Sequence, residues 1–114
     1  MKRVLSLKSN ASFSYIRRKG RRVESRYMAL RYVPAGSLKI GISVSKKLGN
    51  AVTRNLLKRK IKEIFVSVSA SLNKYNIVVT LRDPVTELSY ADMKDDFTAL
   101  LKKAGIFKEN EVSC

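Results

Sequence analysis

The chain has 114 residues, of which 24 are lysine or arginine and nine are acidic, so its formal net charge at pH 7 is +15. This length predicts one domain with a single core, and the 45% hydrophobic and 29% charged content is that of a globular chain rather than a disordered one. The sequence has no histidine and one cysteine, Cys114, which excludes an internal disulfide, the commonest general base and the commonest zinc ligand.

The charge is distributed unevenly along the chain. Residues 1–82 contain twenty basic residues against Glu24 and Glu63, a net of +18, whereas residues 83–114 contain four basic and seven acidic residues, a net of −3. This separation predicts one strongly positive surface, which is typical of a nucleic-acid-binding protein. An anionic membrane is the rival partner, but the predicted helices need their apolar stripes for the core. Because no apolar run reaches membrane-spanning length and no signal-peptide core is present, we expect a cytoplasmic protein.

Residues 9–20 predict a short helix that runs into a basic cluster. Phe13 and Ile16 lie three residues apart on one side, and Gly20 is a natural helix end. The cluster, IRRKGRR at 16–22, contains five cations, and such a run is by itself more often solvated than a specific site. Because a second basic segment follows in the same small domain, we expect the two to share a binding surface.

Two strands are predicted next, over residues 26–33 and 38–45, and the turn between them indicates a hairpin. The second strand alternates between a branched apolar face and a face of small or polar residues that includes Gly41, Ser43 and Ser45. Small residues leave that face low enough for a ligand to approach. From the pattern alone, a solvated sheet face is the simpler interpretation.

The most basic segment of the chain, residues 43–65, begins where the strand pattern changes to a helical one. It holds seven lysines and arginines before its first acid, Glu63, and Gly49-Asn50-Ala51 marks the change. The backbone N–H groups at a helix start attract phosphates. A helix that is charged only for solubility would contain interspersed acids and i,i+4 ion pairs, so their absence favours nucleic-acid binding. The predicted core stripe of this helix is Leu57, Ile61, Ile64, Phe65, Val68 and Leu72.

A third strand and a last helix complete the domain. The nearly continuous apolar run at 76–82 predicts a central strand, and 89–105 predict an amphipathic helix with a capping box at Ser89 and Asp92. A helix connects the strands at 38–45 and 76–82, so those two strands are expected to be parallel.

The fold class that follows is α+β, a small α/β sandwich. Its elements come in the order αββαβα, with one mixed sheet, the helices packed on one face and the other face available. Residues 1–114 are predicted to form a single RNA-binding domain, in which residues 1–8 and 107–114 are flexible.

The sequence gives no support for an active site made of protein side chains. The acids of the last helix, Asp92, Asp95 and Asp96, are better explained as a solvated face near a helix N-terminus than as a metal site. No phosphate-binding glycine loop and no nucleophile motif is present. We therefore expect no catalytic residue and no protein-bound metal.

The segment KIGISVSKKLGNAVTRNLLKRKIKE, residues 39–63, resembles the protein subunit of bacterial ribonuclease P. The pattern of the first helix and the arginine that ends the third strand, Arg82, agree as well. The sequence departs from the family at Leu56, where a basic residue is expected, and at Arg17, where an aromatic one is expected. The motif residues that match are Ser45, Lys46, Lys47, Gly49, Asn50, Ala51, Val52, Arg54, Asn55, Lys58 and Arg59.

The resemblance implies a fold like the second domain of ribosomal protein S5 and a role in an endoribonuclease that removes the 5′ leader from precursor tRNA. In that family a catalytic RNA carries out the chemistry with Mg²⁺ that is held mainly by the RNA. The protein binds the catalytic RNA, promotes productive Mg²⁺ binding and holds the single-stranded leader in a cleft between the first helix and the sheet. The implied partners are therefore the catalytic RNA and the leader, and the free protein is expected to be a monomer.

The resemblance also implies two groups of binding residues. Tyr32 is the alternative to Arg31 in the second group, because a one-residue slip in strand register exchanges the faces. The catalytic-RNA group is Lys47, Asn50, Arg54, Asn55, Lys58, Arg59 and Lys62, and the leader group is Phe13, Arg17, Arg31, Ser43, Ser45, Lys46 and Arg82.

Two other functions remain open at the level of sequence. One is a non-enzymatic RNA-binding protein, such as a ribosomal protein of similar fold. The other is a DNA-binding module, which would need an exposed recognition helix in a helix-turn-helix pair, whereas the most basic helix here follows a strand.

Overall fold

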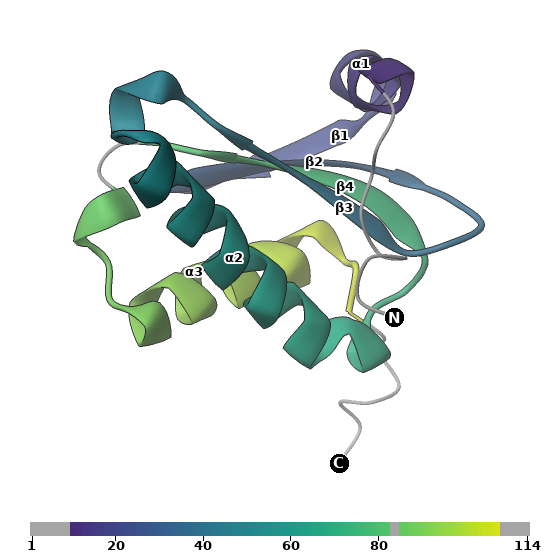
Figure 1. Ribbon diagram of the computed structural model, residues 1–114. Coiled ribbons are helices and arrows are strands. Elements are labelled where there is room, and N and C mark those ends of the chain that lie inside the picture. The colour runs from purple at the N-terminus through teal and green to yellow at the C-terminus, as the bar shows by residue number, and fades with distance from the viewer. Residues whose placement is uncertain (1–9, 83–84, 108–114) are drawn as a thin grey trace.

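The computed structural model describes residues 10–82 and 85–107. A single sheet forms the middle layer, with α2 and α3 on one side and α1 on the other (Figure 1). The helices and strands are α1 (Asn10–Lys19), β1 (Arg21–Glu24), β2 (Met28–Pro34), β3 (Lys39–Val44), α2 (Ala51–Val68), β4 (Tyr75–Leu81) and α3 (Tyr90–Ala104), and three short 3₁₀ turns are η2 (Lys46–Leu48), η3 (Ser69–Ser71) and η4 (Val85–Glu87).

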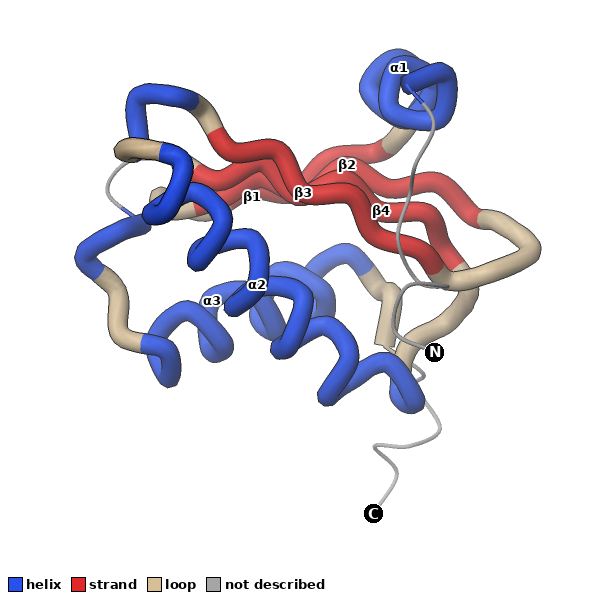
Figure 2. Tube along the Cα trace, in the orientation of Figure 1, coloured by secondary structure: helices blue, strands red, loops and turns tan. Residues whose placement is uncertain are grey.

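The four strands lie in the order β1-β2-β4-β3, as the red segments of Figure 2 show. β2 is antiparallel to both β1 and β4, and β3 is parallel to β4. The predicted parallel pair and the central position of β4 are confirmed. The predicted hairpin between β2 and β3 is wrong, because β4 lies between them. Ile77, Val78 and Val79 are fully buried, so β4 needs cover on both faces and a neighbour on each edge.

The short strand β1 was not predicted, and the order of elements is αβββαβα rather than αββαβα. Three of its four residues, Arg21, Arg22 and Glu24, are exposed and charged, so the local sequence carries little strand signal. Its pairing with β2, which places Arg22 opposite Arg31, creates the strand. Charged side chains are also what an edge strand needs to avoid pairing with other chains.

The main core lies between the sheet and the two helices α2 and α3. The sheet contributes Met28, Leu30 and other buried residues of β2 and β4, and α3 contributes Met93 and Phe97. All six residues of the stripe predicted for residues 50–72 pack in this core, with Val68 partly buried. Full burial of such a side chain contributes about 1.5–3 kcal/mol. The predicted fold class, a small α+β sandwich with one mixed sheet, is confirmed.

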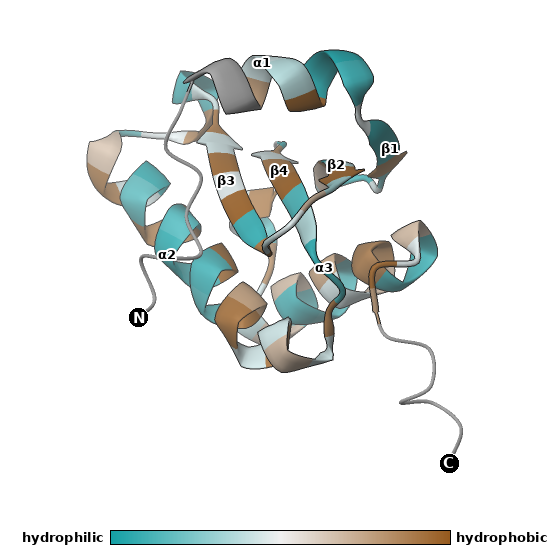
Figure 3. Cartoon of the chain, turned by 90° about the vertical axis from the view of Figure 1, so that its right-hand side faces the viewer, coloured by the Kyte–Doolittle hydropathy of each residue, from teal (hydrophilic) through white to brown (hydrophobic). Residues whose placement is uncertain are grey.

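The opposite face of the sheet is partly covered by α1. Ile16, Val33 and Val78 form a second, smaller buried cluster, against which Phe13 packs. Figure 3 shows α1 as a largely hydrophilic helix lying across the sheet on the side of β3 and β4. The expectation that the helices pack on one face therefore holds for α2 and α3 and is corrected for α1. The reason is that the two valines on this face need apolar cover.

The segments predicted to be flexible lie almost wholly outside the described residues, since 1–8 and 108–114 are not described. Phe107 is described, and it is held by a β-bridge to Leu72 and by the Lys102 ammonium, 5.8 Å from the ring centroid. The chain reaches it through Gly105, which has a φ of 78° and ends α3. Among the described residues, no helix is long and apolar enough to cross a membrane.

Candidate nucleic-acid interface

The junction between β3 and α2 is built from two side-chain caps. The Ser45 hydroxyl accepts a hydrogen bond from the Lys47 N–H at 3.1 Å and starts η2. The Asn50 side-chain carbonyl accepts one from the Thr53 N–H at 2.9 Å and starts α2. These caps fix the backbone that carries Lys46 and Lys47. From the sequence, Ser45 and Asn50 were assigned to RNA binding only, and their capping roles were not predicted.

Gly49, between the two caps, has a conformation that other residues rarely adopt. Its φ is 139° and its ψ is −170°, and a Cβ placed there would lie 3.0 Å from the Thr53 Cβ. Its carbonyl oxygen accepts a hydrogen bond from the Arg54 Nε at 3.2 Å. The Arg54 guanidinium is thereby held close to the junction instead of extending freely from the helix.

The residues assigned to the catalytic RNA by resemblance all lie on η2, the Asn50 cap and α2. At about 100° per residue, Asn55, Lys58, Arg59 and Lys62 share the side of α2 that flanks its buried stripe. Lys58 and Arg59 are exposed and make no ion pair with a described residue. We call this group the α2 surface: Lys47, Asn50, Arg54, Asn55, Lys58, Arg59 and Lys62.

Leu56, at the position where a basic residue was expected, does not serve the core. Its side chain is 45% exposed, and Val52, one turn earlier, is 75% exposed. The α2 surface therefore has an apolar patch beside its cations.

The residues assigned to the leader lie on the face of the sheet that α1 partly covers, and at its β3 end. The strand registers place Arg22, Arg31, Val78 and Gly41 in one row across the four strands. Val78 packs with Ile16 of α1, which identifies this row with the α1 face. The next row on the same face holds Glu24, Ala29, Thr80 and Ser43.

Gly41 lies directly beneath Phe13. A Cβ at Gly41 would stand 2.3 Å from the Phe13 Cζ, so the close approach that the glycine permits is used by the protein's own aromatic ring. The expectation of a low, open surface is corrected at this position, whereas Ser43 is partly exposed and Ser45 is exposed.

The alternative between Arg31 and Tyr32 is decided by the sheet. Arg31 Nη1 donates a hydrogen bond to the Arg17 carbonyl at 3.1 Å, which joins β2 to α1. Tyr32 points to the main core, where it is 7% exposed and packs edge to face on Tyr75 with ring centroids 5.8 Å apart. Arg31 is therefore the residue of this pair on the α1 face.

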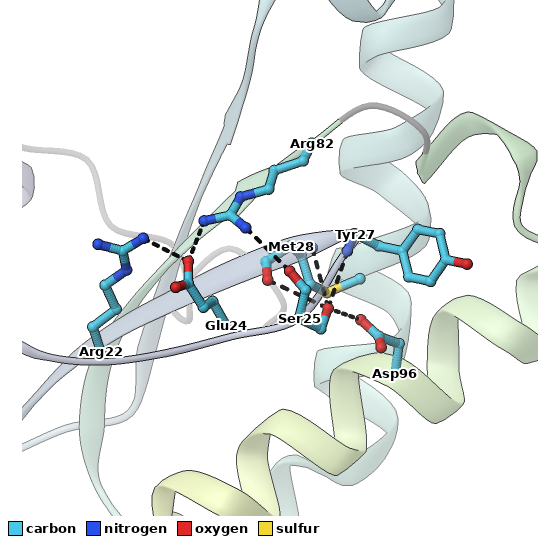
Figure 4. Close-up of polar contacts among 7 residues, drawn as sticks. All are labelled: Arg22, Glu24, Ser25, Tyr27, Met28, Arg82 and Asp96. Carbon is cyan, nitrogen blue, oxygen red and sulfur yellow. Dashed lines mark hydrogen bonds and ion pairs between the residues drawn. The ribbon is translucent and has the colours of Figure 1, made fainter.

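Arg82 takes part in an ion-pair cluster that was not predicted from the sequence (Figure 4). One carboxylate oxygen of Glu24 accepts hydrogen bonds from Arg82 and from Arg22, the latter at 2.5 Å. These bonds, first from Arg82 and then from Arg22, lower the pKa of Glu24. The signal that could have revealed the cluster is the opposite charge of Arg22 and Glu24 two residues apart, which puts both on one face of a strand.

The turn after β1 anchors this cluster to the rest of the fold. Arg82 Nη1 also donates to the Ser25 carbonyl at 3.1 Å, and the Ser25 hydroxyl donates to the Asp96 carboxylate of α3 at 2.6 Å. The same hydroxyl accepts hydrogen bonds from the N–H groups of Tyr27 and Met28 (Figure 4). Arg82 is therefore tied to a turn that α3 holds from the other side of the sheet.

The first basic segment runs from α1, which carries Arg17, Arg18 and Lys19, to one edge of the sheet, and the second begins at the other edge. Arg21 and Arg22 belong to the outer strand β1, whereas Lys46 and α2 follow the other outer strand, β3. Four strands at their usual spacing span about 14 Å. A binding surface that includes both Arg22 and Lys46 must therefore extend across the full width of the sheet. Within 10–82 and 85–107, no three histidine, cysteine or acidic side chains gather where they could hold a metal ion.

Comparison with known proteins identifies the family. The family model for ribonuclease P matches residues 1–105. The chain belongs to the ribonuclease P protein family. The ribonuclease P protein component of Streptococcus agalactiae (strain NEM316) is 39% identical over 108 residues, which cover 93% of this chain and 99% of the relative.

Solved ribonuclease P proteins have the same fold. A Staphylococcus aureus RNase P protein, a mutant described as defective in mRNA degradation activity, superposes with a TM-score of 0.88 at 33% identity, covering 94% of this chain and 93% of that one. The RNase P protein from Thermotoga maritima gives a TM-score of 0.80 at 27% identity, covering 86% and 96%. As a ribonuclease P protein component, the chain is part of a tRNA-processing ribonucleoprotein enzyme and partners the ribonuclease P RNA.

Proposed function

We propose that this ribonuclease P protein binds the catalytic RNA through the α2 surface and the single-stranded 5′ leader of precursor tRNA through the α1 face, while the RNA carries out the cleavage. The observation that carries the proposal is the construction of α2. A buried stripe fixes the helix on the sheet, and Lys58 and Arg59 are exposed beside it without a described acidic partner.

The α2 surface suits a folded RNA because its cations stand on a helix that is fixed in position. Asn50 caps the helix and Arg54 is held against Gly49, so a phosphate meets groups whose freedom was already lost on folding. Binding then loses less conformational entropy than it would with a loose basic tail. This surface follows the β3 edge, where the catalytic RNA would dock.

The α1 face suits a single strand because it combines a partly exposed aromatic ring with scattered cations. Phe13 is held over Gly41, with Arg17 and Arg31 joined beside it, and Ser43, Ser45 and Lys46 continue toward the β3 end. Stacking on an aromatic ring combined with phosphate contacts is the usual way of binding an unpaired strand.

The same charge distribution supports the proposal that the RNA, and not the protein, holds Mg²⁺. Both surfaces are made of residues from the first 82 positions of the chain, which contain two acids, Glu24 and Glu63, against twenty cations. A divalent cation would be repelled there and would be bound by RNA phosphates and water. The protein's part is to hold RNA and leader together so that the RNA binds its Mg²⁺ productively. We propose that it acts as a monomer on one RNA and supplies no catalytic side chain.

Reconstitution of the protein with ribonuclease P RNA tests the proposal directly. We expect faster cleavage of precursor tRNA than by RNA alone at low Mg²⁺, and a larger affinity gain for precursor with a leader than for mature tRNA. Equal gains for the two substrates would contradict leader binding and leave catalytic-RNA binding standing.

Two substitutions on α2 test the catalytic-RNA surface in opposite directions. Arg54→Ala should weaken association with the RNA and reduce the slope of log affinity against log salt by about one unit, as expected for the loss of one phosphate contact. Leu56→Arg should raise the RNA affinity and the salt slope, because it adds a phosphate-binding cation. Leu56 is exposed, so its loss leaves the core intact. Filter binding over a NaCl series measures both, with Leu56→Ala as the control for the loss of the apolar side chain. An unchanged slope in both variants would contradict the assignment of α2.

A further inference from the structure

The cluster of Arg22, Glu24 and Arg82 has the form of an occupied anion site. Two guanidinium groups from opposite sides of β2, one on β1 and one just after β4, converge on a single carboxylate oxygen (Figure 4). Guanidinium groups bind the oxygens of carboxylates and phosphates in the same way. We call the two guanidinium groups of Arg22 and Arg82 together the fork.

The cluster lies on the α1 face, where RNA is proposed to bind. Arg22 stands in the same row as Arg31 and Gly41, and Glu24 stands in the same row as Ser43. The side chains of Arg22, Glu24 and Arg82 are 46%, 45% and 36% exposed. An incoming phosphate can therefore reach both guanidinium groups from solvent.

The stability of the fold alone is a weak reason for an acidic residue at position 24. Exposed ion pairs contribute little to stability, because water screens them. Arg82 is moreover anchored independently by its hydrogen bond to the Ser25 carbonyl. The carboxylate can leave the fork and be solvated without releasing Arg82 from the turn.

We propose that Arg22 and Arg82 form a phosphodiester-binding site for single-stranded RNA, and that Glu24 occupies this site in the free protein. The inference rests on the proposed function, since it assumes that the leader lies on the α1 face. In the complex, a backbone phosphate takes the position of the Glu24 carboxylate between the two guanidinium groups. Glu24 thus lowers the affinity for RNA, and it keeps the fork neutralised until a strand binds.

The expected size of the effect follows from counterion release. Each phosphate contact to a single strand contributes about 0.7 to the slope of log affinity against log salt, which corresponds to about fivefold in affinity near 0.1 M salt. In Glu24→Gln the charge that competes with the phosphate is gone, and the fork becomes fully available. The variant should gain up to this amount.

The experiment uses the reconstituted holoenzyme with precursor tRNA and with mature tRNA, each over a series of NaCl concentrations. For Glu24→Gln we expect about fivefold tighter binding of the precursor and a slope steeper by about 0.7, with mature tRNA unchanged. Asp95→Asn is the matched control, because it makes the same change in net charge at an exposed position on α3. It should leave the ratio of the two affinities unchanged.

A second variant separates the proposal from a purely structural role. In Arg22→Gln combined with Glu24→Gln, the gain should disappear, because half of the fork is missing. If Glu24 only positions the arginines, Glu24→Gln will instead weaken precursor binding, which overturns the proposal, as does an unchanged affinity ratio. If the wild-type holoenzyme fails to distinguish precursor from mature tRNA, the proposed leader function itself has failed. Urea unfolding of each variant confirms that it is folded.

Discussion

Single residues set the geometry of the strand-to-helix junction, and Gly49 is the clearest case. The sequence marks residues 49–51 as a change of direction. The structure adds the physical reason, since a φ of 139° combined with a ψ of −170° is a region in which glycine is nearly the only residue found. The glycine is therefore required by the backbone, whatever the RNA contacts there.

Replacing Gly49 with alanine should be costly. The backbone strain amounts to about 1–3 kcal/mol, and the new Cβ would crowd Thr53, 3.0 Å away. We expect the free energy of unfolding in urea to fall by about 2 kcal/mol, in the middle of that range. Gly36→Ala is the control, because nothing lies within 4 Å of a Cβ there and its φ is not positive. Similar losses in both variants would show that strain at Gly49 is not the cause.

At the scale of the element, α2 joins the core to the proposed RNA surface. Its buried stripe was predictable from periodicity because the stripe depends only on the 3.6-residue repeat. The helix starts at the Asn50 cap, which follows η2 and Gly49 directly. Asn50 therefore has two roles to distinguish, stabilising the helix and contacting RNA.

A pair of cap variants separates these roles. Asn50→Ala and Ser89→Ala remove the same kind of cap from α2 and α3, and each should lower the free energy of unfolding by about 1 kcal/mol. Only Asn50→Ala should also weaken binding to ribonuclease P RNA, because the start of α3 lies in the acidic part of the chain. Thermal unfolding and filter binding measure the two effects. Equal losses of RNA affinity would mean that general destabilisation explains both.

At the scale of the whole molecule, charge dominates. The net charge is +15, and Arg22 and Arg82 share a single acid, Glu24, in their ion pairs. The folded protein therefore repels itself, and bound RNA relieves that repulsion.

Salt should consequently have opposite effects on folding and on RNA binding. Raising NaCl screens the repulsion in the free protein, and a gain of about 1 kcal/mol would raise Tm by about 4–8 °C. The same salt weakens RNA binding, because the release of counterions from the RNA gains less free energy when the salt concentration is higher. Differential scanning fluorimetry and binding measurements across one NaCl series test both signs. A Tm that falls with NaCl would show that attractive ion pairs outweigh the repulsion.

The sequence by itself determined the class of fold, the stripe of α2, the parallel pair β3 and β4, and the excess of positive charge, because each depends on local periodicity or on composition. Only the tertiary structure decided the strand order, the existence of β1, the choice of Arg31 over Tyr32 and the meeting of Arg22 with Arg82 at Glu24. These features depend on which strands pair and in which register, and pairing is fixed by contacts between residues far apart in the chain. For the same reason Gly41 receives Phe13, a contact that neither segment specifies until α1 is folded across the sheet.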